Sequence, residues 1–277
     1  HELDAQIILS KLMGVEREYL IIKDKINISE KIMDKYDAAI KRRINKEPIA
    51  YIVGKKEFWS ENFVVDSSTL IPRPESELLI YKVIKYFKNK SISILDIGTG
   101  SGCILLSILK ELNFSRGVGI DVSSKAIKIA RLNSKKLKLF NRSSFKSVNI
   151  NNFTHGKYDL IVSNPPYICT EEIPKLSAEV QQEPRCALDG GVDGLEVTRR
   201  LLRQASALIR PGGLILLEIA PEALEQVRKL ALHFMPGGCV SFVKDLMGLP
   251  RVVMISHPDG DGDAVYRLAS SSTVVQA

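Results

Sequence analysis

An Asn-Pro-Pro-Tyr tetrapeptide directly follows residues 158–163, an apolar segment typical of a buried strand. Proline fixes φ and has no N–H group, so the two prolines predict a rigid loop with bare carbonyl groups. The asparagine side-chain oxygen and the first proline carbonyl then provide two hydrogen-bond acceptors at fixed positions. Two such acceptors suit a planar NH2 group, either a glutamine or asparagine amide or the exocyclic amine of a nucleobase. The candidate catalytic residues are Asn164, Pro165, Pro166 and Tyr167, and the tyrosine ring would stack on the planar group.

Taken alone, the tetrapeptide is also compatible with an ordinary turn at the end of a strand. A glycine-rich turn strengthens the functional interpretation, because it follows a second apolar run, at 91–97, and precedes a helical pattern. Glycine lets the backbone approach a ligand closely at the carboxyl end of a strand. A dinucleotide fingerprint would need a third glycine where Cys103 stands, so the spacing favours an adenosine that carries methionine. The predicted cofactor-binding residues of this turn are Gly98, Thr99, Gly100, Ser101 and Gly102.

Asp121 ends the next predicted strand, roughly twenty residues farther on, where a carboxylate can accept hydrogen bonds from ribose hydroxyls. A helix N-cap is the alternative role, since Ser123 and a helical pattern follow. The end of the third predicted strand should lie near the adenine. We assign this position to Asn149, with Ile150 and Asn151 as alternatives, and include Asn164 among the cofactor-binding residues because it lies at the same edge.

Hydrophobic periodicity predicts the elements that position these residues. Residues 1–50 read as a small helical domain, 51–74 as a hairpin connector, 75–257 as an alternation of strands and helices, and 258–277 as a flexible tail. Such alternation implies an α/β fold, with a doubly wound sheet covered by helices on both faces. The predicted helices are 3–12, 29–44, 101–112, 123–137, 195–208 and 223–234, and the predicted strands are 91–97, 117–121, 145–149, 158–163, 213–219, 240–244 and 252–256.

Composition excludes several classes of protein. The chain has 277 residues, 45% of them hydrophobic and 26% charged, which excludes a disordered or disulfide-stapled class. No apolar run approaches the ~18 residues of a membrane span. The four cysteines have no CxxC spacing and lie apart from the four histidines, so we expect no metal site and reduced thiols. The net charge of +7 decides little about partners.

Four segments together resemble the HemK/PrmC family of release factor glutamine N5-methyltransferases. These are Ile-Pro-Arg-Pro-Glu at 71–75, the turn at 96–102, the tetrapeptide with Ile168, and Glu-Pro-Arg-Cys-Ala-Leu-Asp-Gly-Gly at 183–191. The resemblance implies a Rossmann-like class I methyltransferase sheet, mostly parallel with an antiparallel last strand, after a helical substrate-recognition domain. It also implies S-adenosyl-L-methionine as cofactor and the glutamine of the Gly-Gly-Gln motif of peptide chain release factors as substrate.

The same resemblance implies a cytoplasmic or organellar-matrix protein, a monomer that binds neither membranes nor specific nucleic-acid sequences. One position departs from the family pattern, because an acidic or aromatic residue usually stands where we place Asn149. The tetrapeptide is shared with enzymes that methylate amino groups of DNA or RNA bases, which leaves an amino-methyltransferase of nucleic acid as the alternative. The segments at 71–75 and 183–191 favour the glutamine substrate.

Overall fold

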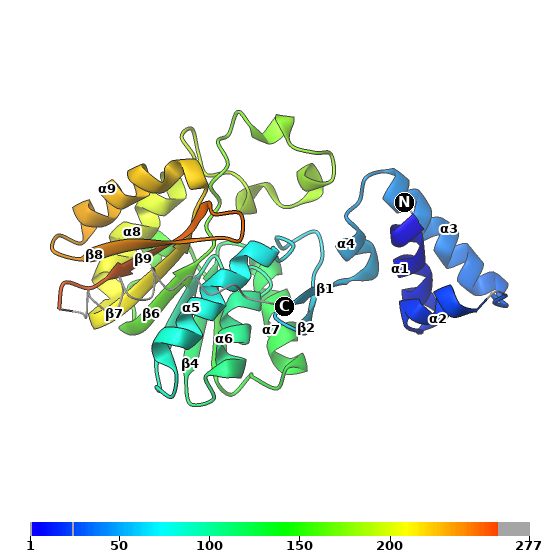
Figure 1. Ribbon diagram of the computed structural model, residues 1–277, viewed down its shortest axis with the longest axis horizontal. Coiled ribbons are helices and arrows are strands. Elements are labelled where there is room, and N and C mark those ends of the chain that lie inside the picture. Colours follow the sequence, from blue (N-terminus) through cyan, green and yellow to red (C-terminus); the bar gives the residue numbers. More distant parts are fainter. Residues whose placement is uncertain (1, 24, 260–277) are drawn as a thin grey trace.

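The computed structural model describes residues 2–23 and 25–259, so most of the expected tail at 258–277 lies outside the described residues. A helical N-terminal region stands to one side of a larger α/β unit and is joined to it through a two-stranded hairpin (Figure 1). The helical region holds α1 (Glu2–Met13), α2 (Arg17–Ile22), α3 (Glu30–Ile44) and α4 (Ile49–Val53), and the hairpin holds β1 (Lys55–Phe58) and β2 (Glu61–Val64). None of the helices in the described ranges has the length and apolar character needed to cross a membrane.

The expected hairpin does not include Tyr51, because Tyr51 and its apolar neighbours form helix α4 and the hairpin is formed by residues 55–64. Pro48 is the N-cap residue of this helix, and Gly54 is its C-cap residue, in the left-handed conformation at φ 75°. Tyr51 is buried, and its hydroxyl donates a 2.6 Å hydrogen bond to the carbonyl oxygen of Thr69. Tertiary packing therefore overrides the strand preference of this β-branched and aromatic segment.

A seven-stranded sheet forms the centre of the α/β unit, in the order β5-β4-β3-β6-β7-β9-β8. The first five strands in this order are parallel, and β9 runs antiparallel to both neighbours, so the expected sheet is confirmed. The strands are β3 (Ser93–Ile97), β4 (Arg116–Asp121), β5 (Ser143–Ser147), β6 (Tyr158–Ser163), β7 (Ile209–Glu218), β8 (Cys239–Lys244) and β9 (Pro250–Ser256). The helices are α5 (Glu77–Phe87), α6 (Cys103–Glu111), α7 (Ser124–Lys136), α8 (Glu196–Leu208) and α9 (Leu224–Phe234).

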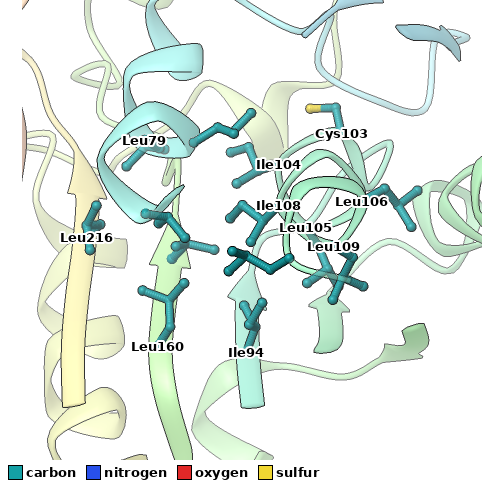
Figure 2. Close-up of a cluster of buried hydrophobic side chains, with 14 of the residues drawn as sticks. Leu79, Ile94, Cys103, Ile104, Leu105, Leu106, Ile108, Leu109, Leu160 and Leu216 are labelled. Carbon is teal, nitrogen blue, oxygen red and sulfur yellow. The ribbon is translucent and has the colours of Figure 1, made fainter. Parts of the chain in front are cut away.

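Each face of the sheet has its own hydrophobic core. Ile94, Leu160 and Leu216 project from neighbouring strands toward apolar side chains of α5 and α6 (Figure 2). On the opposite face, alternate residues of the same strands, such as Leu95 and Ile161, pack with apolar residues of α8 and α9. This alternation follows from the period-two geometry of a strand, and it confirms helices on both faces.

The third strand of the nucleotide-binding half lies two residues earlier than expected. Strand β5 pairs with β4 from Ser143 to Ser147, whereas the sequence predicted residues 145–149. The first two residues of this edge strand are serines, so the apolar pattern by which we located it begins too late. Asn149 consequently lies in the loop after the strand, as the N-cap of a short 3₁₀ turn.

A buried asparagine links the hairpin to the α/β unit. Asn133 on α7 is fully buried, and its side-chain oxygen accepts a 2.7 Å hydrogen bond from the N–H of Val64. Its side-chain nitrogen donates to the carbonyl oxygens of Val64 at 3.0 Å and Ser101 at 2.9 Å. One amide therefore holds β2 and the glycine-rich turn against the same helix.

We expect Asn133→Ala to lower the free energy of unfolding by ~2–3 kcal/mol, because buried backbone groups lose their hydrogen-bond partner. Denaturant unfolding measures this change, and the control is Asn113→Ala, at an exposed asparagine in the loop after α6. A difference between the two variants below about 0.5 kcal/mol would show that the link contributes little to stability.

Candidate active site

The two loops chosen from the sequence meet at one edge of the sheet. Strands β3 and β6 are adjacent and parallel, with Ile94 opposite Leu160 and Asp96 opposite Val162, so the loops that follow them emerge side by side. The Ser163 hydroxyl donates a 2.6 Å hydrogen bond to the carbonyl oxygen of Ile97, which fixes the two strand ends to each other. The sheet changes winding direction at this point, which is where open α/β sheets bind ligands.

A cavity of about 440 Å³ lies at this edge, a volume in the range of small-molecule sites. The predicted site residues that line it are Gly98, Gly100, Asp121, Asn149, Asn164, Pro165 and Pro166. The predicted residues that do not line it are Thr99, Ser101, Gly102 and Tyr167. Thr99 and Ser101 are buried behind the turn, and Gly102 is the N-cap residue of α6.

The glycine-rich turn needs glycine at its alternate positions. Gly98 and Gly100 have φ of +72° and +54°, a region that residues with a side chain rarely adopt. The N–H groups of Gly98 and Thr99 donate to the carbonyl oxygen of Ile120, at 2.9 and 3.0 Å, so the turn folds against β4. Behind it, the Thr99 hydroxyl donates to Asp96, whose pKa burial raises to about 7.

Asp121 supports the turn and faces the cavity. Its two carboxylate oxygens accept from the N–H groups of Gly100 and Ser123, each at 2.9 Å. A carboxylate has about four acceptor sites, so both oxygens can still accept hydrogen bonds from a ligand. Burial raises the pKa of Asp121 above its ordinary value. The cap of α7 is Ser123, whose hydroxyl accepts from the N–H of Ala126 at 3.1 Å.

Asn149 lies at the wall of the cavity between Val148 and Ile150, which line it as well. Its side-chain oxygen accepts a 3.0 Å hydrogen bond from the N–H of Asn151, and the residue is exposed. Ile150, the first alternative, is buried and gives this wall an apolar surface.

Asn164 is held by a chain of hydrogen bonds that the sequence did not reveal. Its side-chain nitrogen donates to the hydroxyl of Ser76 at 3.0 Å, and this hydroxyl donates to Glu218 Oε2 at 2.5 Å. Ser76 and Glu218 are each 1% exposed. Burial raises the pKa of Glu218 to about 7, although hydrogen bonds from Ser76 and Asn164 and the charge of Arg251 lower it.

The segment at 183–191 folds back onto the tetrapeptide. Backbone hydrogen bonds join Ile168 N to Leu188 O at 3.1 Å and Gly190 N to Ile168 O at 2.8 Å. Gly194 packs so closely that a Cβ there would lie 2.5 Å from the carbonyl oxygen of Tyr167. Burial raises the pKa of Tyr167 to about 12, so its ring carries an uncharged hydroxyl at neutral pH.

Glu183 joins the segments at 71–75 and 183–191. One of its oxygens accepts from the N–H of Ile71 at 2.9 Å, and the other accepts from the Arg73 guanidinium. The glutamate side chain is 2% exposed, so its end of the ion pair is shielded from water, whereas the Arg73 side chain is partly exposed. Two of the four segments that carried the family resemblance are therefore one structural unit, which places Ser76 beside the tetrapeptide.

The remaining wall of the cavity comes from residues that we did not choose from the sequence. Some follow the hairpin, some belong to the segment at 183–191 and some to α8. They include Thr69, Leu70, Cys186, Ala187, Val197, Arg200 and Leu201. Within the described residues, no group of three or more histidine, cysteine, aspartate or glutamate side chains is placed to hold a metal ion.

The lining fits a nucleoside-sized ligand with one charged or polar end. A positive-φ glycine turn, a carboxylate at the end of the next strand and an apolar wall at Ile150 are the features that a ribose and a flat base require. Asn164 and Pro165 line the same cavity, and each carries an oxygen that can accept a hydrogen bond. The arrangement can therefore bring a planar NH2 group up to a bound adenosine derivative.

Comparisons with known proteins agree with this arrangement. A model of the PrmC N-terminal domain matches residues 1–54, and a model of a methyltransferase domain matches residues 88–234. A release factor glutamine methyltransferase of Bradyrhizobium diazoefficiens is 38% identical over 263 residues, which cover 91% of this chain and 86% of that protein. A protein of the same name from Caulobacter vibrioides is 38% identical over 260 residues, covering 91% and 88%.

A methyltransferase structure from Pyrococcus furiosus superimposes with a TM-score of 0.54 at 18% identity, over 81% of this chain and 98% of that one, which shows a shared fold. The similarity in sequence to the two bacterial proteins extends across both the helical region and the α/β unit. The chain belongs to the release factor glutamine methyltransferase family.

Proposed function

We propose that this chain transfers a methyl group to the side-chain amide nitrogen of the glutamine in the Gly-Gly-Gln motif of peptide chain release factors. The observation that carries this proposal is that residues of both loops line one shared cavity. These residues are Gly98, Gly100, Asp121, Asn164 and Pro165. The names of the relatives and the matched N-terminal domain support the protein substrate.

The methyltransferase domain uses S-adenosylmethionine, which supplies an electrophilic methyl group when bound. Asp121 would accept hydrogen bonds from the ribose hydroxyls, and the turn at 98–102 would leave room for the methionine part. We propose that Asn149 and Ile150 lie beside the adenine. Ile150 provides the apolar surface that a flat base needs, which makes it the stronger contact of the two.

The role of Asn164 and Pro165 is to orient the substrate amide. The Asn164 side-chain oxygen and the Pro165 carbonyl each accept one N–H of the glutamine NH2 group, which raises the electron density on its nitrogen. Tyr167 and Pro166 shape the loop around the planar group. Most of the rate gain comes from positioning, because the chemistry needs no covalent enzyme intermediate. The N-protonated product loses its proton to these same acceptor oxygens or to water.

Further assignments follow from the same proposal. We propose residues 1–50 as the domain that recognises the release factor, 51–74 as the connector and 75–257 as the catalytic domain. We also propose that the chain works as a monomer in the cytoplasm, where release factors act on ribosomes.

The direct test incubates the chain with labelled S-adenosylmethionine and, side by side, a release factor, DNA and RNA. We expect label only in the release factor, on the glutamine of its Gly-Gly-Gln motif, as located by mass spectrometry. Label in DNA or RNA with none in the release factor would replace this proposal with the nucleic-acid alternative.

For the cofactor, we expect Asp121→Ala to weaken binding by ~1–3 kcal/mol, because hydrogen bonds to a charged group are lost. Calorimetry measures the dissociation constant, and the free energy of unfolding is followed in parallel to confirm that the variant is folded. An unchanged affinity would remove Asp121 from the cofactor site.

For the chemistry, we expect Asn164→Ala to lower methyl transfer by about 10²–10³, the scale for losing one preorganised hydrogen-bonding group. Cofactor affinity should change much less, since the turn at 98–102 does not depend on this amide. Single-turnover kinetics and calorimetry separate the two effects. Near-normal turnover would mean that the tetrapeptide is only a turn.

For recognition of the release factor, Arg43 offers a test within the folded chain. It pairs with Asp4 of α1 at 2.7 Å and with Glu179, in the segment between β6 and α8, at 3.1 Å, and so connects the helical region to the α/β unit. We expect Arg43→Ala to raise the KM for a whole release factor about twofold to fivefold, which matches the free energy that a partly exposed ion pair contributes. The KM for a short Gly-Gly-Gln peptide should stay unchanged.

The matched control is Arg42→Ala, because Arg42 pairs only with Glu47 inside the helical region among the described residues. Equal effects of Arg43→Ala on the protein and the peptide would indicate that the contact serves stability alone.

A further inference from the structure

We propose that Glu218, together with Ser76, is a positioning residue that sets which end of the Asn164 amide faces the substrate. This inference rests on the proposed function and adds a residue and a protonation requirement to it. The three side chains come from different parts of the chain: Ser76 precedes α5, Asn164 follows β6, and Glu218 ends β7.

The direction of the hydrogen bonds among Glu218, Ser76 and Asn164 fixes the orientation of the Asn164 amide. An ionised carboxylate only accepts hydrogen bonds, and a serine hydroxyl has a single proton to donate. The Ser76 proton is given to Glu218 Oε2, so Ser76 Oγ is left as an acceptor for Asn164. Only the amide nitrogen can donate to Ser76 Oγ and to the ionised Glu218 carboxylate, so the Asn164 oxygen is left for the substrate. No side chain or backbone group of the described residues donates a hydrogen bond to that oxygen.

Protonation of Glu218 would remove this constraint. A protonated carboxyl group can donate its own proton to Ser76 Oγ, and the serine proton is then free to turn toward Asn164. In that state the inverted orientation of the amide, with its NH2 group toward the substrate, also becomes available. Two NH2 groups cannot hydrogen bond to each other productively, so the inverted site does not orient glutamine.

The surroundings of Glu218 make this protonation accessible near neutral pH. Both Glu218 and Ser76 are buried, and burial raises the pKa of the carboxyl group to about 7. The charged and titratable groups around it are Glu75 beside Ser76, Arg251 on β9 and Tyr167 after β6. Glu75 raises this pKa and Arg251 lowers it, while Arg251 is itself paired with Asp245 at 3.2 Å.

Methyl transfer should depend on pH through the ionisation of Glu218. Above the pKa of Glu218 the carboxylate is ionised and the amide of Asn164 is correctly oriented, and below it the oriented fraction falls. We therefore expect methyl transfer to decline as the pH falls through about 7. Glu75→Gln removes a negative charge that raises this pKa, so it should move the decline to lower pH without abolishing it.

Two variants of the chain separate positioning from structure. Glu218→Gln and Ser76→Ala should each lower transfer about 10-fold to 100-fold, as when a hydrogen bond to a charged group is lost, with cofactor affinity unchanged. Glu218→Gln should also lose the acidic decline in the pH profile. Combining either change with Asn164→Ala should cost no more than Asn164→Ala alone, because the effect passes through that amide.

The control for removing a buried serine hydroxyl is Ser107→Ala on α6. Ser107 is 1% exposed, and its hydroxyl has no hydrogen-bond partner among the described residues. We expect normal transfer and an unaltered pH profile. A Glu218→Gln variant that keeps the parent turnover and pH profile would overturn the proposal, as would full additivity with Asn164→Ala.

A readout that needs no substrate keeps this inference separate from the proposed function. The side-chain NH2 signal of Asn164, identified by its absence in Asn164→Ala, is followed by ¹⁵N NMR as the pH is changed. We expect a titration with a midpoint of about 7 in the parent chain and none in Glu218→Gln. A titrating amide in a chain that fails to methylate release factors would contradict the function but support the hydrogen-bond chain. Methylation with an amide signal that does not titrate would contradict the hydrogen-bond chain and leave the function standing.

Discussion

The parallel pairing of β3 and β6 is the constraint on which the rest of the site depends. Because Asp96 lies opposite Val162, the glycine-rich turn and the Asn-Pro-Pro-Tyr loop leave the sheet at the same height, and the Ser163 hydroxyl bond to Ile97 fixes that register. A one-residue slip would turn alternate side chains to the other face and separate the two loops. The hydrophobic layers on both faces therefore do more than stabilise the fold, because they hold the two loops of the proposed adenosine and amide sites at one cavity.

The second requirement is that the tetrapeptide loop be rigid on both sides. Its prolines restrict the backbone from within. From outside, the segment at 183–191 restricts it through the hydrogen bonds of Ile168, and the following Gly194 restricts it through a close contact with Tyr167. Glu183 carries this restriction to the segment at 71–75, which presents Ser76 to Asn164. Segments that are distant in sequence therefore act on a single amide group.

The sequence predicted the features that depend on local pattern. The glycine turn, Asp121 and the tetrapeptide each lie next to a strand whose apolar run identifies it, and their shared edge follows from parallel topology. Local pattern failed where packing decided the conformation, as at Tyr51, or where an edge strand began with polar residues, as at Ser143. Ser76 and Glu218 could not be found in this way, since 88 residues separate Ser76 from Asn164 and 142 separate it from Glu218. A lone serine after a proline turn and a lone glutamate at a strand end have ordinary structural explanations until the fold brings them together.

In the proposed complex, one substrate NH2 group donates to both the Asn164 side-chain oxygen and the Pro165 carbonyl. A crystal structure of the chain with S-adenosylhomocysteine and a Gly-Gly-Gln peptide would reveal this geometry. We expect the glutamine nitrogen to lie within about 3.2 Å of both oxygens, with the Asn164 nitrogen still directed to Ser76. A glutamine nitrogen beyond about 4 Å from both oxygens, or an Asn164 amide with its nitrogen toward the substrate, would contradict the claim.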